Sequence, residues 1–397
     1  MSLATFAKAA RNAIVRLEID ANIKRGREFV PVTRDLLHIE TTSLCNLKCR
    51  FCAYEKKQSA KVVMPDAMFR DLIEQAVDMG FERFELTPCT GDVFMDKRLF
   101  DKLEFLDNHP RVRGYTFFTN FTIPKPRDVE RLTRLAKLQH LTVSVYGHDL
   151  ESFIAIAVST EKVYRRLIAN LEALLELLPK KRFGLEIAFR TTRNIPRPHA
   201  SDLLRLLQRF ERASIHVRRS RVYNNWGGYI TQDDVAGLGI DVTGTDATYK
   251  KGACILLLTA VQVMATGIVN GCACRDVDAT LRIGDLKTQA LRDILSADNA
   301  HWMGLIDEQQ RGEFRPVCNS CDFYKSIYHV RSKHRRQGIP MQTLAQFKAN
   351  LARRAAGGVG SGELSRERRV IPIELRRSAG PSHVAEADAS LGEHERR

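Results

Sequence analysis

Three cysteines follow one another closely near the start of the chain, at positions 45, 49 and 52. Thiolates bind zinc and iron–sulfur clusters, and the metal in both sites takes ligands in a tetrahedral arrangement. Cys45, Cys49 and Cys52 would therefore leave one metal position open for another molecule. The alternatives are a zinc ion in place of a cluster, and three buried cysteines that bind no metal. We favour an iron–sulfur cluster with one open iron.

A second group of cysteines lies toward the C-terminal side and ends in the pair Cys318-x-x-Cys321. Pairs at this spacing serve zinc and iron–sulfur sites equally well. The first residues lack the apolar stretch of a signal peptide, and no run approaches the roughly 18 apolar residues of a membrane span. We therefore expect a cytoplasmic protein, in which nine cysteines indicate metal binding or catalysis rather than disulfides.

Strand and helix patterns alternate between residue 36 and about residue 225. The elements that they predict could position the cysteines. The expected strands cover residues 36–40, 83–86, 115–119, 141–146, 183–190 and 215–223. The expected helices cover residues 66–79, 98–106, 127–137, a long stretch ending near residue 178, and 200–212. This alternation is typical of parallel βαβ units. Six units are too few for a full eight-unit barrel, so we predict an α/β fold with a partial (β/α)6 TIM-like barrel.

Polar residues collect at the expected C-terminal ends of these strands, which is where barrels of this kind carry their chemistry. The cysteine loop follows the first strand. The other groups, in strand order, are Cys89 to Asp92, Thr119-Asn120, Ser144 within the fourth strand, Arg190, and Tyr223 to Gly228. One barrel mouth would gather all of them.

The motif Cys45-x-x-x-Cys49-x-x-Cys52, with the aromatic Phe51 directly before its last cysteine, resembles the signature of the radical S-adenosylmethionine (SAM) superfamily. The resemblance covers the first two-thirds of the chain. It implies that the three cysteines hold a SAM-binding 4Fe–4S cluster. In that family the reduced cluster passes an electron to SAM, which splits into methionine and a 5′-deoxyadenosyl radical that takes a hydrogen atom from the substrate. A flavodoxin- or ferredoxin-like protein would supply the electron.

The same resemblance implies a set of SAM contacts. Phe51 would meet the adenine, Ser144 the ribose, and Arg190 the carboxylate of SAM. Asp92 would bind the amino group, although Thr90-Gly91-Asp92 departs in two residues from the Gly-Gly-Glu segment of the family. One anion and one cation suit the zwitterionic end of SAM. The alternative for each is an ordinary polar residue at a strand end.

The second cysteine group resembles the SPASM/twitch extension of this superfamily, because Gly267 precedes Cys272 and the group closes with the pair at 318 and 321. The full SPASM pattern binds two clusters with more cysteines than the five of this group. We therefore expect one auxiliary 4Fe–4S cluster, with Cys274 spare and a zinc ribbon as the alternative. The expected ligands are Cys254, Cys272, Cys318 and Cys321.

Single-cluster twitch enzymes include an aminocyclitol dehydrogenase, in which the substrate radical hands an electron to the auxiliary cluster. Related enzymes with a spare cysteine return a hydrogen atom from the opposite face and so epimerise their substrate. Cys274 and Cys89 are the candidate catalytic thiols of this kind, and a buried inert cysteine is the alternative for each.

We therefore expect a radical SAM enzyme of oxidoreductase or epimerase type, acting on a small polar molecule such as a sugar or an aminocyclitol. The alternatives are a peptide-modifying SPASM enzyme and a non-enzymatic, metal-bearing RNA-binding protein. The net charge of +15 is spread along the chain, and no basic stripe is interleaved with stacking aromatic residues. We therefore expect no nucleic-acid partner.

The expected domains are an N-terminal helical extension over residues 1–35, the partial barrel over 36–228, the linker and SPASM/twitch domain over 229–330, and a basic, disordered tail over 331–397. One face of the extension is apolar. It comprises Phe6, Ala10, Ala13, Ile14 and Leu17. This helix either packs on the outside of the main domain or binds a membrane surface or a partner.

Overall fold

A nine-stranded sheet forms the centre of the computed structural model, which describes residues 3–32, 36–87, 89–192, 195, 201–220, 222–245 and 248–355. Six neighbouring strands run parallel and in sequence order. They are β2 (Leu36–Ile39), β3 (Arg83–Glu85), β4 (Gly114–Thr119), β5 (Leu138–Tyr146), β6 (Gly184–Arg190) and β7 (His216–Ser220). These strands confirm the predicted α/β fold with six parallel units.

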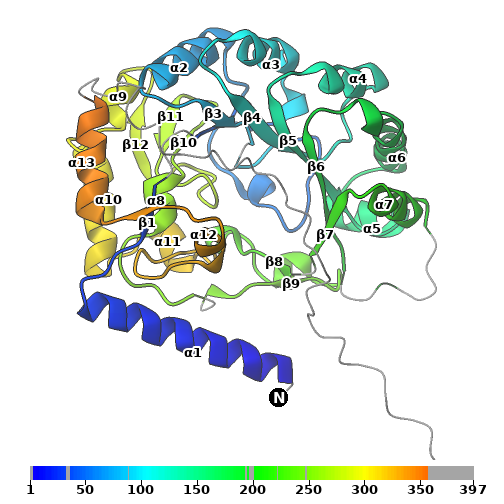
Figure 1. Ribbon diagram of the computed structural model, residues 1–397. Helices are drawn as coiled ribbons and strands as arrows, with labels where there is room; N and C mark the ends of the chain where they lie inside the picture. Colours follow the sequence, from blue (N-terminus) through cyan, green and yellow to red (C-terminus); the bar gives the residue numbers. More distant parts are fainter. Residues whose placement is uncertain are drawn as a thin grey trace, which may run out of the picture. The chain divides into compact units, whose positions relative to one another are not determined.

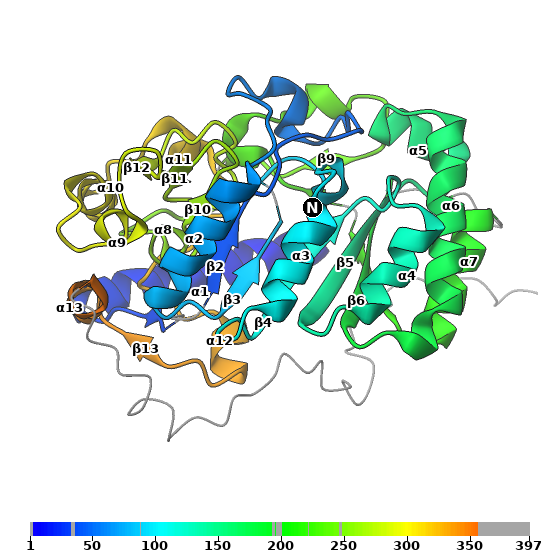
Figure 2. The same cartoon turned by 90° about the horizontal axis from the view of Figure 1, so that it is seen from above.

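Helices connect the parallel strands, and most of them lie along the outer side of the curved sheet (Figures 1 and 2). They are α2 (Asp66–Asp78), α3 (Leu99–Asn108), α4 (Pro126–Arg134), α5 (Leu150–Ala157), α6 (Glu161–Glu176) and α7 (Asp202–Arg212). Helix α6 shows why they pack there, because its buried residues recur every three or four positions. Strand β5 is buried continuously from Leu141 to Val145, as a strand covered on both faces requires.

The expected long helix before residue 178 is two helices. Helix α5 ends where Val158 adopts a left-handed backbone with φ of 46°, and α6 begins at Glu161. The prediction of one helix was wrong because the apolar spacing runs through the break without a glycine or proline to mark it. The break leaves the last carbonyls of α5 free to bind another part of the chain.

The C-terminal cysteine region continues the same sheet. Strand β10 (Gln262–Val263) pairs in parallel with β2, and the antiparallel strands β11 (Ile268–Asn270) and β12 (Arg282–Asp285) follow. Its helices are α8 (Ile255–Thr259), α9 (Leu291–Ile294), α10 (Ala300–Arg311) and α11 (Pro316–Ser320). The apolar run of residues 255–258 lies in α8, although a short apolar run of this kind would fit a buried strand equally well.

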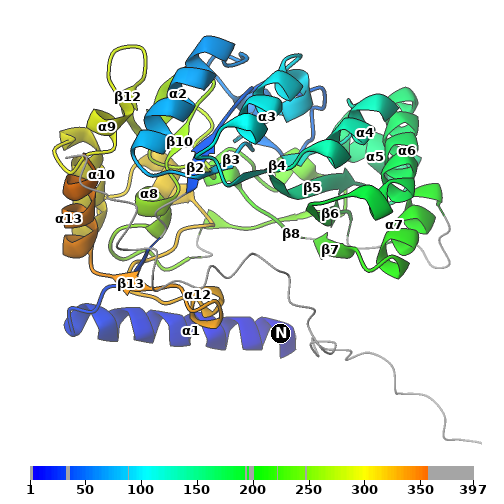
Figure 3. The same cartoon turned by 45° about the horizontal axis from the view of Figure 1, so that its top comes forward.

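Helix α1 (Leu3–Lys24) lies beside α12 (Ser332–Arg336) in Figures 1 and 3. It buries Ile19 and Asn22, whereas Ile14 and Leu17 of the predicted apolar face are 65% and 70% exposed. The helix therefore packs on the main body through a face other than the one that its apolar residues indicate.

The predicted disordered tail from residue 331 is wrong for its first part. Strand β13 (Met341–Gln342) pairs antiparallel with β1 (Val30–Pro31), and α13 (Leu344–Ala355) follows it. The Phe347 ring packs edge-on against Trp302 of α10, with 5.9 Å between ring centres. The basic composition of this segment thus masked a helical spacing of apolar residues. The rest of the predicted tail, residues 356–397, lies outside the described residues.

Short elements complete the chain. They are the single helical turns η1 (Ala53–Lys56), η2 (Val93–Met95), η3 (Leu178–Lys180), η4 (Trp226–Gly228) and η5 (Asp233–Val235), with the strands β8 (Val222–Tyr223) and β9 (Asp241–Val242). Among the described residues, no helix combines the length and the apolar character needed to cross a bilayer.

Candidate functional site

The three-cysteine loop follows β2 and is held by the broken end of α5. The backbone N–H groups of Lys48 and Arg50 donate to the carbonyls of Ala157 and Ile156, at 3.1 and 3.0 Å. The N–H of Cys45 donates to the hydroxyl of Tyr54 at 3.1 Å. The break between α5 and α6 therefore fixes the loop that carries the thiols.

The thiols of this loop lie close enough together to interact electrostatically. Burial, followed by the charge of Asp92, raises the pKa of Cys45 to about 12. Burial raises the pKa of Cys52 to about 11, and burial together with its two neighbouring thiols raises the pKa of Cys49 further. Hydrogen bonds from the backbone at Leu47 and at Tyr54 act in the opposite direction on Cys45 and Cys52. One buried and two partly buried cysteines with backbone donors suit an iron–sulfur cluster, whose positive irons stabilise the thiolates.

The segment Thr90-Gly91-Asp92 packs directly on the cysteine loop. Gly91 has a φ of 133°, and a Cβ atom there would lie 2.9 Å from the carbonyl oxygen of Leu44. The N–H of Asp92 donates to that same oxygen at 2.8 Å. Only glycine fits this close approach, so the segment after β3 is bound to the loop after β2.

The Asp92 carboxylate is buried at the end of β4 and accepts three donors from the chain itself. The N–H of Asn120 donates at 2.6 Å, the hydroxyl of Thr119 at 2.9 Å and the N–H of Phe94 at 3.0 Å. Burial raises the pKa of Asp92, and these hydrogen bonds lower it. Two carboxylate oxygens can accept about four hydrogen bonds, so the predicted contact with the SAM amino group has room for one more donor.

Aromatic residues at the ends of β5 and β8 meet Phe51 of the cysteine loop. Its ring centre lies 5.1 Å from that of Tyr146 and 4.8 Å from that of Tyr223. The guanidinium carbon of Arg190 lies 5.8 Å from the same ring centre. Burial and the neighbouring Cys49 thiol raise the pKa of Tyr146. Phe51 and Arg190, two of the predicted SAM contacts, are thus neighbours beside the thiols.

Ser144 lies on the same face of β5 as Tyr146 of the aromatic cluster. It lies two residues before Tyr146 on β5, and side chains two apart point to the same face of a strand. Tyr146 and Arg190 are partners in the register of β5 and β6. The predicted ribose contact therefore lies on the face of the sheet that carries the aromatic cluster.

The five cysteines of the C-terminal region form a second group. The thiol of Cys272 interacts with those of Cys274, Cys254 and Cys321, and its pKa is raised well above the usual range, mainly by burial. Cys318 interacts with Cys254 and Cys321. The four predicted auxiliary ligands are thus neighbours, and Cys274 lies next to them.

Gln309 of α10 connects two of these cysteines. Its side-chain amide donates to the Cys318 sulfur at 3.3 Å, and its carbonyl oxygen accepts the N–H of Cys254 at 2.8 Å. The N–H of Phe323 donates to the Cys321 sulfur at 3.2 Å. Donors aimed at sulfur are what an iron–sulfur or zinc thiolate site requires, so this group also fits a metal centre.

Cys89 lies close to the C-terminal group of thiols. Burial raises the pKa of its thiol, and so do the nearby groups Glu40, Asp276 and Cys274. Its N–H donates to the Glu40 carboxylate at 3.3 Å. The buried ammonium of Lys57 donates to the carbonyl of Val277 in the C-terminal region. The two candidate catalytic thiols, Cys89 and Cys274, are therefore close enough to interact electrostatically.

Polar and aromatic residues that follow β5 and β8 make contacts within the chain itself. The Asn225 side chain donates to the carbonyl of Ser320 at 2.7 Å and accepts the N–H of Gly227. His148 is buried, and its ring lies 3.0 Å from the hydroxyl of Thr191. The Trp226 ring lies beneath the guanidinium of Arg275 at 5.4 Å.

Sequence reasoning missed several residues that the structure places here. Tyr146 and Tyr223 are the last residues of β5 and β8, and this position at a strand end is the signal that could have identified them. Glu40 precedes the cysteine loop, while Lys57 and Gln309 carry no motif that marks them. In the part of the chain that the structure describes, no three His, Cys, Asp or Glu side chains already form a closed ion-binding set.

Comparison with known families agrees with this geometry. The model of the radical SAM superfamily matches residues 39–189, and that of the SPASM iron–sulfur cluster-binding domain matches residues 254–322. The chain therefore belongs to the radical SAM superfamily and carries a C-terminal SPASM domain. These domains imply a SAM-binding 4Fe–4S cluster, SAM and an auxiliary iron–sulfur cluster as cofactors. Both matches fall inside the predicted ranges 36–228 and 229–330, whose limits remain a prediction.

Solved structures show distant likenesses. BtrN in complex with AdoMet and 2-DOIA is 16% identical with a TM-score of 0.46, over 76% of this chain and 100% of that chain. Streptococcus suis SuiB bound to precursor peptide SuiA is 17% identical with a TM-score of 0.48, over 80% and 78%. Native anSMEcpe with AdoMet and Cp18Cys peptide is 13% identical with a TM-score of 0.45, over 82% and 97%. These likenesses are too distant to bear on the substrate. Comparison with curated proteins gives no significant match.

Proposed function

We propose that this radical SAM enzyme removes a hydrogen atom from a small polar molecule, such as a sugar or an aminocyclitol, and thereby oxidises or epimerises it. The proximity of Cys89, after β3 of the barrel, to Cys274, beside the auxiliary thiols, supports this proposal. A substrate between the two thiol groups would be within reach of both. Bound SAM and the reduced cluster would supply the hydrogen abstraction itself.

The chain would bind and orient SAM through groups of opposite charge. Arg190 would bind the carboxylate and Asp92 the amino group, so that each end of the zwitterion meets a charged partner. Phe51, Tyr146 and Tyr223 would form an apolar wall that keeps water from the reacting atoms.

Oxidation and epimerisation differ in what happens to the substrate radical after its hydrogen atom has been removed. Oxidation of a secondary alcohol consumes one SAM and gives a ketone, methionine, 5′-deoxyadenosine and one proton, with one electron returned to the auxiliary cluster. Epimerisation instead needs a thiol that gives a hydrogen atom, and an electron and a proton to restore that thiol. Cys274 and Cys89 are the candidate donors, and a reduced flavodoxin- or ferredoxin-like protein would supply the electron.

The experiment is anaerobic incubation of the reconstituted protein with SAM and dithionite, followed by quantification of 5′-deoxyadenosine. We expect product from the wild type and none from the Cys45→Ala/Cys49→Ala/Cys52→Ala variant. Product at the level of the variant would refute the enzymatic function. About eight irons per chain would support two clusters, and about four irons with one zinc would favour the zinc alternative.

The chain's charge and cysteines support two further parts of the proposal. A net charge of +15 favours an acidic electron donor such as a flavodoxin, because opposite charges speed association. Free cysteines at all nine positions suit a reducing compartment such as the cytoplasm. Reduction by flavodoxin should slow steeply between low and physiological salt, and a salt-independent rate would contradict the acidic donor.

A further inference from the structure

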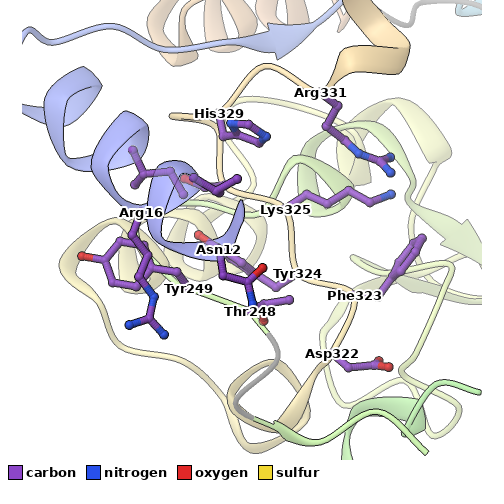
Figure 4. Close-up of a pocket in the computed structure, with 13 residues that line it drawn as sticks. Asn12, Arg16, Thr248, Tyr249, Asp322, Phe323, Tyr324, Lys325, His329 and Arg331 are labelled. Atoms are coloured by element: carbon purple, nitrogen blue, oxygen red, sulfur yellow. The ribbon is translucent and has the colours of Figure 1, made fainter. Parts of the chain in front are cut away.

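A cavity of about 340 Å³ lies between α1 and the segment that follows the Cys318-x-x-Cys321 pair (Figure 4). Helix α1 contributes Asn12, Val15, Arg16 and Ile19 to its wall. The opposite wall carries Phe323, Tyr324, Lys325, His329 and Arg331, with Thr248 and Tyr249 at one side. This volume is at the lower end of the range of ligand sites, which is about 300–1,000 Å³.

Positive charge dominates the lining. Lys325 and Arg331 extend in the same direction in Figure 4. Among the described residues, no carboxylate pairs with the ammonium of Lys325 or the guanidinium of Arg331. The third cation is Arg16, which lies over the Tyr249 ring at 5.4 Å.

The acids near the cavity are already engaged. Asp322 is the one carboxylate among the described lining residues, and it lies 3.9 Å from Arg275 and accepts the N–H of Asn225. Asp20 of α1 accepts the hydroxyl of Tyr249 at 2.8 Å, and Glu18 lies 3.1 Å from His329. Among the described residues these cations thus have no carboxylate counter-ion, although the Cys254 and Cys274 thiols interact electrostatically with Lys325. Placing like charges together is unfavourable unless an anion binds between them.

Helix α1 is held firmly as the second wall. Besides the contact of Asp20 with Tyr249, the Asn22 side chain donates to the carbonyl of Tyr328 at 2.9 Å. The cavity is therefore part of the packed structure of residues 12–331 and does not depend on a loose helix.

We propose that this cavity binds the phosphate monoester group of a small molecule, between Lys325 and Arg331 and with Arg16 at the α1 side. A phosphate monoester carries about 1.5 to 2 negative charges at pH 7, which matches the two unpaired cations. A guanidinium binds two phosphate oxygens at once, and an ammonium adds a third contact. The Lys325 ammonium lies over the Phe323 ring at 3.9 Å and the Arg16 guanidinium over the Tyr249 ring at 5.4 Å, so aromatic rings help to position two of these cations.

The same phosphate group could belong to a soluble sugar phosphate or to the headgroup of an anionic lipid. Exposed Ile14 and Leu17 on α1 lie beyond the cavity-lining face of that helix. The experiment therefore has a soluble arm and a vesicle arm, and binding in either arm that needs Lys325 and Arg331 supports the phosphate site.

The soluble arm is calorimetric titration of the reconstituted protein, without reductant, with glucose 6-phosphate and with glucose. We expect saturable binding of the phosphate alone, weakened at least about tenfold in Lys325→Gln and in Arg331→Gln. The matched control is Arg127→Gln, whose side chain is 76% exposed on α4 and which should bind as the wild type does. Cluster absorption and far-ultraviolet circular dichroism check that each variant is folded.

The vesicle arm is co-sedimentation with phosphatidylcholine vesicles that contain phosphatidic acid. Sedimentation that Lys325→Gln and Arg331→Gln abolish would identify the lipid source. No binding of glucose 6-phosphate, inorganic phosphate or these vesicles by wild-type protein would overturn the proposal, as would binding that is unchanged in both variants. Because no arm uses SAM cleavage, failure here is distinct from failure of the proposed reaction.

Discussion

The guanidinium of Arg190 lies 5.8 Å from the centre of the Phe51 ring, so the end of β6 meets the loop that carries the first three thiols. Arg190 also acts electrostatically on the thiols of Cys49 and Cys52, where its charge lowers their pKa. A cation at this point can therefore serve both the thiolates and an anionic group of SAM.

Replacing Arg190 with methionine should weaken SAM binding by about 10- to 100-fold, the cost of losing a charged hydrogen bond. Equilibrium binding of SAM to the reconstituted protein measures this, and Arg190→Lys should recover part of the affinity. The matched control is Arg218→Met on β7, whose guanidinium pairs with Glu186 at 2.8 Å. Equal SAM affinity in Arg190→Met and wild type would exclude the predicted carboxylate contact.

Gly91→Ala should remove the SAM-binding cluster without unfolding the barrel. Its Cβ would lie 2.9 Å from the Leu44 oxygen, and the backbone φ of 133° is unfavourable for alanine by about 1–3 kcal/mol. We expect a loss of about four irons per chain. Gly304→Ala is the control, because no atom lies within 4 Å of its Cβ, and helix α10 should gain about 1 kcal/mol. Full iron content in Gly91→Ala would contradict this role of the glycine.

The partial barrel could be predicted from the sequence, because buried strands and amphipathic helices each have a recognisable pattern of apolar residues. The first three cysteines could be found from their spacing, and Arg190 from its place at a strand end. The break at Val158 was not visible, although it supplies the carbonyls that hold the cysteine loop. No local pattern encodes that contact, since it joins residues about one hundred positions apart.

The side of α1 that packs on the body was also beyond sequence reasoning. Its apolar residues Ile14 and Leu17 predict the buried face, but the structure buries Ile19 and Asn22 instead. Hydrogen bonds hold the helix in this orientation, because Asn22 donates to the carbonyl of Tyr328 and Asp20 accepts the hydroxyl of Tyr249. Hydrogen bonds to distant partners leave no periodic signal in the helix itself.

Gln309→Leu should lower the reduction potential of the auxiliary cluster by an amount on the order of tens of millivolts. Its amide donates to the Cys318 sulfur at 3.3 Å, and hydrogen bonds to sulfur favour the reduced cluster. A redox titration followed by electron paramagnetic resonance measures the shift. Gln310→Leu is the control, because Gln310 accepts the N–H of Ala253 and does not contact a sulfur. An unchanged potential in Gln309→Leu would show that this hydrogen bond does not tune the cluster.

Acid should destabilise the protein through His38 on β2. Burial lowers the pKa of His38 from 6.5 to about 4, so the folded state keeps this ring neutral while the unfolded state binds a proton. The stability present above pH 6.5 is therefore lost as the pH falls toward 4, by about 1.4 kcal/mol for each pH unit. Glu85, the register partner of His38 on β3, has a pKa raised by burial and acts in the opposite sense.

The difference between wild type and His38→Gln isolates the histidine from Glu85 and from the other titrating groups. Urea unfolding at pH 7 and pH 5.5 should show a smaller loss of stability in His38→Gln than in wild type. Glutamine keeps a polar side chain at this position but has no proton to gain in this range. If both proteins lost the same free energy of unfolding between the two pH values, His38 would titrate normally in the folded state, and the buried environment of β2 between β10 and β3 would not hold its ring neutral.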